Sequence, residues 1–213
     1  MTLLFDSSFL GFSAIVTSIQ QVLIFLGQVC WPSNVILEMS YPLSVTFIAA
    51  VMLGASATQT SYAGLTTRQS LWCALVFTWS ARLALHLAYR VPSSDPRFRF
   101  LRSSRRKLAL FLAFQALTVW FNAMFFPVML RPSSALSNAP NNDNNNPPLG
   151  SLDYAGVAIG AFGILLETVA DAQKARWHAQ SQAQPQTASS APRSLLWRWS
   201  IRPNYFGEAL AWW

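Results

Sequence analysis

The sequence predicts an all-α fold: a polytopic helical membrane protein with about five complete transmembrane helices and a truncated sixth. Of its 213 residues, 53% are hydrophobic and only 11% are charged, whereas soluble domains average about 25% charged residues. Apolar runs long enough to cross a bilayer recur along the chain, and the charges gather in short segments between them. Orientation in a membrane therefore explains the formal net charge of +7 better than nucleic-acid binding does.

The apolar runs predict the positions of the spans, since a helix needs roughly 20 mostly apolar residues to cross a bilayer. The five complete runs cover about residues 9–31, 41–57, 70–90, 108–130 and 152–175, and the second is marginal in length. A sixth run starts at Pro203; its remaining ten or so residues rise about 15 Å, half of a hydrocarbon core of roughly 30 Å. We therefore expect a fragment of a longer protein, or a second chain that completes this span.

Basic residues predict how these spans are oriented. Residues 90–107 hold seven of the fifteen Lys and Arg, and the basic segment 174–202 follows two spans later. Loops 91–107 and 176–202 are therefore expected on the cytosolic side, in the endoplasmic reticulum if the organism is eukaryotic. Two polar segments, about 131–151 and 179–194, are predicted to be disordered loops.

Several common functional motifs do not occur in the sequence. Cys30 and Cys73 lie inside apolar runs without metal-binding spacing, and His86 and His178 are the two histidines, so no metal site is predicted. The chain has no GxGxxG or GxxxxGK[ST] phosphate-binding loop, no GxSxG and no HExxH. A bound nucleotide would therefore lie between membrane helices rather than on a soluble dinucleotide fold.

The third predicted span carries three basic residues on one helical face. Arg82, His86 and Arg90 recur every four residues, and charges inside a span normally pair or line a site. In the structural interpretation, which we favour, Arg90 lies at the interface, His86 reaches toward it and Arg82 pairs with an acid on another helix. In the functional interpretation, this face forms a wall of a pocket for an anionic cofactor.

The fifth predicted span carries two acidic residues on one face. Glu167 and Asp171 are four residues apart and repel each other, and Lys174 offsets part of this repulsion. A cation, or hydroxyl and amide donors, would satisfy both carboxylates. The alternative is an Asp171–Lys174 pair within the helix together with a bond from Glu167 to Arg82.

The segment after residue 197 has the features of an anion-binding helix start. Pro203 suits a first helical turn, and the free amides and positive dipole end there attract phosphate. Arg198 and Arg202 add positive charge beside it.

Further polar groups follow within the same helix. Asn204 and Glu208 share a face, and Tyr205 offers a hydroxyl and a ring. This pattern predicts a nucleotide with phosphate at the helix end and its polar edges deeper. Alternatively, Trp197, Trp199 and Tyr205 form an interfacial aromatic belt.

Four stretches resemble one family. LWRWSIRPNYFGEALAWW, at residues 196–213, is similar to the W-R-Y-S-R-H-P-N-Y-F-G-E…WW signature of the DUF1295 proteins, relatives of the steroid 5-alpha-reductase C-terminal domain. ETVADAQKARW resembles their E-x-x-A-D-x-Q-K stretch, and FTWSARLALHLAYR resembles W-x-x-R-L-x-x-H-L-x-x-R, while FQALTVW also fits. The resemblance covers residues 70–213 and departs at Ile201-Arg202, where the family has Arg-His. It divides the chain into N-terminal membrane helices, 1–69, and an incomplete reductase-like membrane domain, 70–213.

The resemblance implies a membrane-embedded, NADPH-dependent enzyme of lipid metabolism. Hydride would pass to the β-carbon of a double bond conjugated to a carbonyl, in a lipid or steroid-like substrate, and an acid or Tyr would protonate the α-carbon. The alternatives are a membrane methyltransferase that uses S-adenosylmethionine and a truncated, non-catalytic membrane paralogue. The implied cofactor-binding residues are Glu167, Asp171, Lys174, Arg198, Arg202, Asn204, Tyr205 and Glu208.

Overall fold

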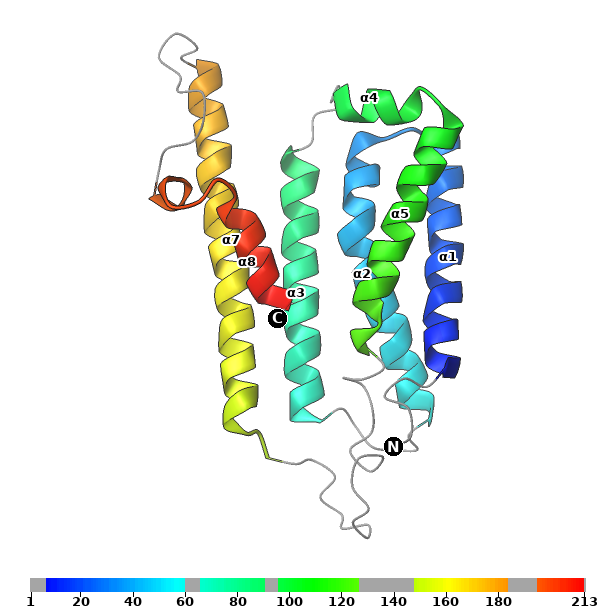
Figure 1. Cartoon of the computed structure of the whole chain (residues 1–213), viewed down its shortest axis with the longest axis vertical. Coiled ribbons are helices and arrows are strands. Elements are labelled where there is room, and N and C mark those ends of the chain that lie inside the picture. The colour runs from blue at the N-terminus through cyan, green and yellow to red at the C-terminus, as the bar shows by residue number, and fades with distance from the viewer. Residues whose placement is uncertain (1–6, 60–65, 91–95, 127–147, 184–194, 213) are drawn as a thin grey trace. The chain divides into compact units, whose positions relative to one another are not determined.

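The structure, a computed structural model, describes residues 7–59, 66–90, 96–126, 148–183 and 195–212. Within these ranges all regular structure is helical, which confirms the predicted all-α class (Figure 1). The helices are α1 (Ser7–Cys30), α2 (Asn34–Gln59), α3 (Thr67–Arg90), α4 (Pro96–Arg102), α5 (Arg105–Ala123), α7 (Ser151–Ala183), the short 3-10 helix η2 (Leu195–Arg198) and α8 (Pro203–Trp212).

Four of these helices are long and apolar enough to cross a membrane, namely α1, α2, α3 and α7. The chain is therefore an integral membrane protein by the length and composition of its helices. The fourth predicted span corresponds to α5, a 19-residue helix that begins with Arg105, Arg106 and Lys107. The sixth corresponds to the 10-residue helix α8. The number of about five complete spans and a truncated sixth stays a prediction.

Helices α2 and α7 extend well beyond the boundaries that the apolar runs predict. The second span was placed at 41–57, but α2 begins at Asn34 and contains Pro42. Ser33 caps this start, because the amide of Ile36 donates to its Oγ at 3.3 Å. The helix α7 begins at Ser151 and continues to Ala183, so residues 151 and 179–183 of the predicted disordered loops are helical. The other residues of those loops, except 148–150, lie outside the described ranges.

The chain forms two compact units, Met1–Pro148 and Leu149–Trp213. In the first unit, α2 packs against α1, α3 and α5, and α1 also packs against α5. The short α4 runs across the direction of these long helices (Figure 1). In the second unit, α8 lies against α7. The division at residues 69 and 70 rests on sequence resemblance and stays a prediction.

Polar side chains join the helices inside the first unit. Gln21 Nε2 donates to Ser44 Oγ at 3.2 Å, and Gln115 Nε2 donates to Ser40 Oγ at 2.7 Å. Ser80 Oγ donates to the carbonyl of Pro42 at 2.5 Å. Such bonds hold membrane helices together, because lipid gives apolar side chains little reason to leave it for the interior.

Large apolar side chains cover the outside of the same unit. On α5, for example, Phe114 is 72% exposed and Leu117 is 63% exposed, while Gln115 between them is buried. A smaller apolar core lies where α4 meets the long helices, around Leu37, Phe98, Leu108 and Leu112. Polar groups inside and aromatic groups outside are the reverse of a soluble bundle and suit a lipid environment.

The basic face of α3 makes a contact within the first unit. Arg90 Nη2 lies 3.8 Å from Glu38 Oε2 on α2. This pair gives Arg90 a partner that the sequence analysis did not name. The predicted bond between Arg82 and Glu167 would join the two units and stays a prediction.

Candidate functional site

Two glycines bring α7 and α8 into backbone contact. A Cβ on Gly163 would lie 2.6 Å from the amide nitrogen of Ala211 and 2.6 Å from the carbonyl oxygen of Gly207. A Cβ on Gly207 would lie 2.7 Å from the amide nitrogen of Glu167. Both distances are too short for any side chain, so glycine is required on each helix. This close approach fixes the register of the helix pair.

The register places the predicted acids beside the start of α8. The two helices are antiparallel, since Gly163 faces Ala211 while Gly207 faces Glu167. One turn earlier on α8, Asn204 therefore lies at the level of the next turn of α7, which contains Asp171. Glu167, Asp171 and Asn204 are 3%, 5% and 8% exposed. The structure thus brings the two carboxylates and the amide together in a buried contact between two helices.

The side chain of Asn204 contains a buried acceptor atom that no described residue uses. Its Oδ1 is buried and has no hydrogen-bond partner among the described residues. A buried polar atom without a partner costs about 1–3 kcal/mol, so its presence in a folded protein needs an explanation, of which a functional role is one. A ligand with a hydroxyl or amide donor would satisfy it.

The N-terminus of α8 adds amide donors next to Asn204. The first amide that bonds within the helix is that of Phe206, which donates to the carbonyl of Arg202 at 3.3 Å. Arg202 therefore occupies the N-cap position. Its side chain has no oxygen that could accept a hydrogen bond from the backbone amides of the first turn. The amides of Asn204 and Tyr205 and the positive dipole end make this a place for an anion.

An aromatic anchor connects the segment before α8 to α7. Trp197 Nε1, in η2, donates to the carbonyl of Ala170 at 3.1 Å, and Lys174 Nζ lies 5.6 Å from the centroid of the Trp197 ring. The guanidinium of Arg202 lies 5.4 Å from the centroid of the Tyr205 ring. Trp197 thus attaches η2 to α7, and the Arg202 side chain lies beside the first turn of α8 through its contact with the Tyr205 ring.

The eight predicted cofactor-binding residues differ in burial. Glu167, Asp171 and Asn204 are buried, Lys174 and Glu208 are half-buried, and Arg198, Arg202 and Tyr205 are exposed. All eight lie on α7, η2, α8 or the turn between them. The result is a buried acidic and amide interior with a basic, accessible rim. Their role in binding a cofactor stays a prediction.

Some residues that build this site were not singled out from the sequence. Gly163 and Gly207 set the helix contact, and Trp197 anchors η2 through its indole rather than only lying at an interface. A glycine inside a helical pattern signals close packing, and that signal was present at both positions. Among the described residues, no group of three or more His, Cys, Asp and Glu could hold a metal ion.

Comparison with models of known families shows which family the chain belongs to. The family model described as "Protein of unknown function (DUF1295)" matches residues 16–213. The chain belongs to the DUF1295 family. The match begins well before residue 70, so the N-terminal helices are part of the DUF1295 region as well. Searches of curated proteins and of solved structures found no match.

Proposed function

We propose that this DUF1295 protein is a membrane-embedded, NADPH-dependent reductase of a carbon–carbon double bond in a lipid or steroid-like substrate. The observation that carries the proposal is the unpartnered, buried Oδ1 of Asn204 at the start of α8. The buried carboxylates of Glu167 and Asp171 occupy the same helix contact. An uncapped helix start with arginines beside it supports a phosphate-bearing ligand rather than a neutral one.

The donor set fits the parts of a dinucleotide. The amides of Asn204 and Tyr205, with Arg198 and Arg202, would bind phosphate at the accessible rim. The side-chain amide of Asn204 would accept a hydrogen bond from, and donate one to, a carboxamide or a ribose hydroxyl. Glu167 and Asp171 would accept hydroxyl donors and orient the ligand. When bound, NADPH would supply the hydride that reduces the double bond.

The proposal assigns different tasks to the rim and to the interior. The exposed arginines contribute charge, so their loss would weaken phosphate binding in a manner that depends on salt. Asn204 contributes a directional contact inside a buried region, where a missing partner costs more. Lys174, which lies over the Trp197 ring, would help to hold η2, and with it Arg198, against α7.

NADPH titration of the purified protein in lipid nanodiscs tests the proposal. Asn204→Ala should weaken NADPH binding about tenfold to a hundredfold, the equivalent of a buried hydrogen bond of about 1–3 kcal/mol. Glu208→Ala should weaken it as well, because it removes a half-buried acceptor from the same face of α8. Isothermal titration calorimetry measures the affinity directly. Thr168→Ala is the matched control, since Thr168 is an exposed residue of α7 whose hydroxyl donates to its own helix at Ile164.

A second substitution separates loss of binding from loss of fold. Asn204→Leu removes the unpartnered acceptor, so the protein without cofactor should unfold at an unchanged or higher temperature while NADPH binding falls. Unchanged NADPH affinity in both Asn204→Ala and Glu208→Ala would refute the site. Saturable binding of S-adenosylmethionine but not NADPH to the same preparation would instead identify the methyltransferase alternative.

A further inference from the structure

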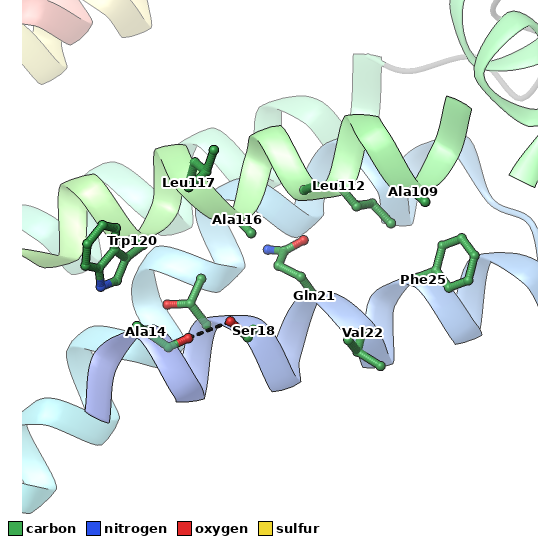
Figure 2. A pocket seen from close by; sticks show the side chains of 12 residues that line it. Ala14, Ser18, Gln21, Val22, Phe25, Ala109, Leu112, Ala116, Leu117 and Trp120 are labelled. Atoms are coloured by element: carbon green, nitrogen blue, oxygen red, sulfur yellow. Dashed lines mark hydrogen bonds between the residues drawn. The ribbon is translucent and has the colours of Figure 1, made fainter. Parts of the chain in front are cut away.

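The first unit contains a groove between α1 and α5 that the proposed cofactor site does not use. Its volume is about 680 Å³, within the range of roughly 300–1,000 Å³ that is usual for small-molecule sites. Figure 2 shows Trp120 of α5 toward one end of the groove and Phe25 of α1 toward the other. It shares no residue with the α7–α8 site and is independent of the proposed function.

The two walls of the groove are mostly apolar. On α5, Ala109, Ala113 and Ala116 recur along one face and leave a smooth wall between larger neighbours. On α1, Val22 and Phe25 also line the groove, and Figure 2 shows the Phe25 ring on the side of α1 that faces α5. Because Val22 and Leu117 at its margins are exposed apolar residues, the groove is continuous with a lipid-facing surface. A lipophilic molecule from the bilayer fits this setting.

Gln21, which lines this groove, carries a polar atom without a hydrogen-bond partner among the described residues. Gln21 is 5% exposed, and its Nε2 donates to Ser44 Oγ at 3.2 Å. Its Oε1 is buried and has no hydrogen-bond partner among the described residues. Figure 2 shows the Gln21 amide pointing from α1 toward α5, near Leu112 and Ala116. A carbonyl oxygen without a donor in an apolar site is costly, and a ligand hydroxyl would remove that cost.

The other two polar residues of α1 in the groove also offer acceptors rather than donors. Thr17 Oγ1 donates to the carbonyl of Ser13 at 2.7 Å, and Ser18 Oγ donates to the carbonyl of Ala14 at 2.8 Å. Each hydroxyl has used its hydrogen and retains its lone pairs. The polar side chains of α1 therefore offer acceptors to a ligand that donates a hydrogen bond.

We infer that the α1–α5 groove binds a neutral lipid that carries a hydroxyl group on its apolar body, with the hydroxyl donating to Gln21 Oε1. Gln21 lies near the middle of the candidate span Gly11–Cys30, so the hydroxyl is recognised within the hydrocarbon depth rather than at the headgroups. A ketone at the same place would oppose one acceptor to another and would be rejected. A plain hydrocarbon would leave Gln21 Oε1 unpaired.

The test compares three probes that differ only in this group. The mid-chain secondary alcohol of heptadecane, the corresponding ketone and heptadecane itself compete for the purified full chain in nanodiscs with tritiated alcohol as tracer. The alcohol should bind about tenfold or more tightly than the other two. Gln21→Leu should lower the affinity for the alcohol to about that of the other two probes. Gln115→Leu, which changes a buried glutamine outside the groove that bonds to Ser40, should keep the preference for the alcohol.

A second variant covers the case in which Gln21→Leu does not fold. Ala113 is exposed in the groove, so Ala113→Phe fills the space without disturbing the interior and should remove saturable binding of all three probes. Equal binding of the three probes by the unmodified protein would overturn the inference. So would retention of the alcohol preference in a folded Gln21→Leu protein, or unchanged binding in Ala113→Phe.

Discussion

Trp197 shows how one side chain connects two parts of the second unit. Its indole N–H bonds to a carbonyl of α7, and Lys174 lies over its ring. In the sequence, the alternative interpretation of Trp197 was a ring at a membrane interface, because Trp is frequent there. It did not predict the bond, since the acceptor is a backbone carbonyl 27 residues away in the chain.

Replacement of Trp197 should therefore weaken the attachment of η2 to α7. Trp197→Phe keeps a ring for Lys174 but removes the N–H donor, and should lower the free energy of unfolding by about 1 kcal/mol. Thermal unfolding in detergent, followed by near-ultraviolet circular dichroism, measures the change. Trp199→Phe is the matched control, because Trp199 is 90% exposed. An equal effect of both substitutions would contradict the role assigned to the Trp197 indole.

At the scale of elements, the contact between α7 and α8 depends on two glycines, which have a hydrogen atom where other residues have a side chain. Gly163→Ala and Gly207→Ala each place a methyl group within 3 Å of backbone atoms of the other helix, and backbone cannot move aside as a side chain can. Each should destabilise the protein by about 1–3 kcal/mol and weaken NADPH binding, because Asn204 moves away from α7.

Gly156 provides the control for this experiment. It lies on the same helix, and a Cβ there would meet nothing within 4 Å. Gly156→Ala should raise stability by about 0.5–1 kcal/mol, because alanine favours a helix. Thermal unfolding of the three variants in one detergent gives the comparison. A stable Gly207→Ala protein with normal cofactor affinity would show that the close approach is not needed.

Helix boundaries could be predicted where apolar runs and caps agree. Thr66 and Gln69 bond reciprocally at the start of α3, at 2.9 and 3.3 Å, and this capping box is visible in the sequence. The start of α2 was missed, because Glu38 and Pro42 interrupt the apolar pattern. The helix tolerates them there: Glu38 pairs with Arg90, and Ser80 donates to the carbonyl of Pro42.

The candidate functional residues also differ in whether the sequence could predict them. Glu167, Asp171 and Asn204 were predictable, because polar residues inside or beside a span need a reason. Gln21 meets the same criterion and was overlooked, since its significance depends on α5, which is about 90 residues away in the chain. The α1–α5 groove could not be predicted, because nothing in the sequence shows which helices are neighbours.

At the scale of the whole molecule, the distribution of basic residues makes a prediction about topology. Ser103 lies in the segment 91–107 and Ser200 in the segment 176–202, and both are exposed, as is Pro148. In a background of Cys30→Ser and Cys73→Ser, Ser103→Cys and Ser200→Cys should react with a membrane-impermeant maleimide from the cytosolic side of sealed vesicles. Pro148→Cys should react from the opposite side.

One outcome of the labelling experiment would contradict the predicted topology. If Ser103→Cys and Ser200→Cys react from different sides, the number of membrane crossings between them is odd. In that case, the prediction that the fourth and fifth spans both cross the membrane between these positions would be wrong. Labelling after detergent lysis controls for accessibility, since all three positions should then react equally.

The glycine in α8 has a consequence for how the second unit assembles. Gly207 lowers the helical tendency of this segment, so much of the stability of the helix comes from packing against α7 rather than from propensity. Chain order helps, because α7 is synthesised first and can serve as a template for the later segment. The proposed anion-binding end of α8 would then form only on docking, so the proposed phosphate contacts and the helix contact should appear and disappear together.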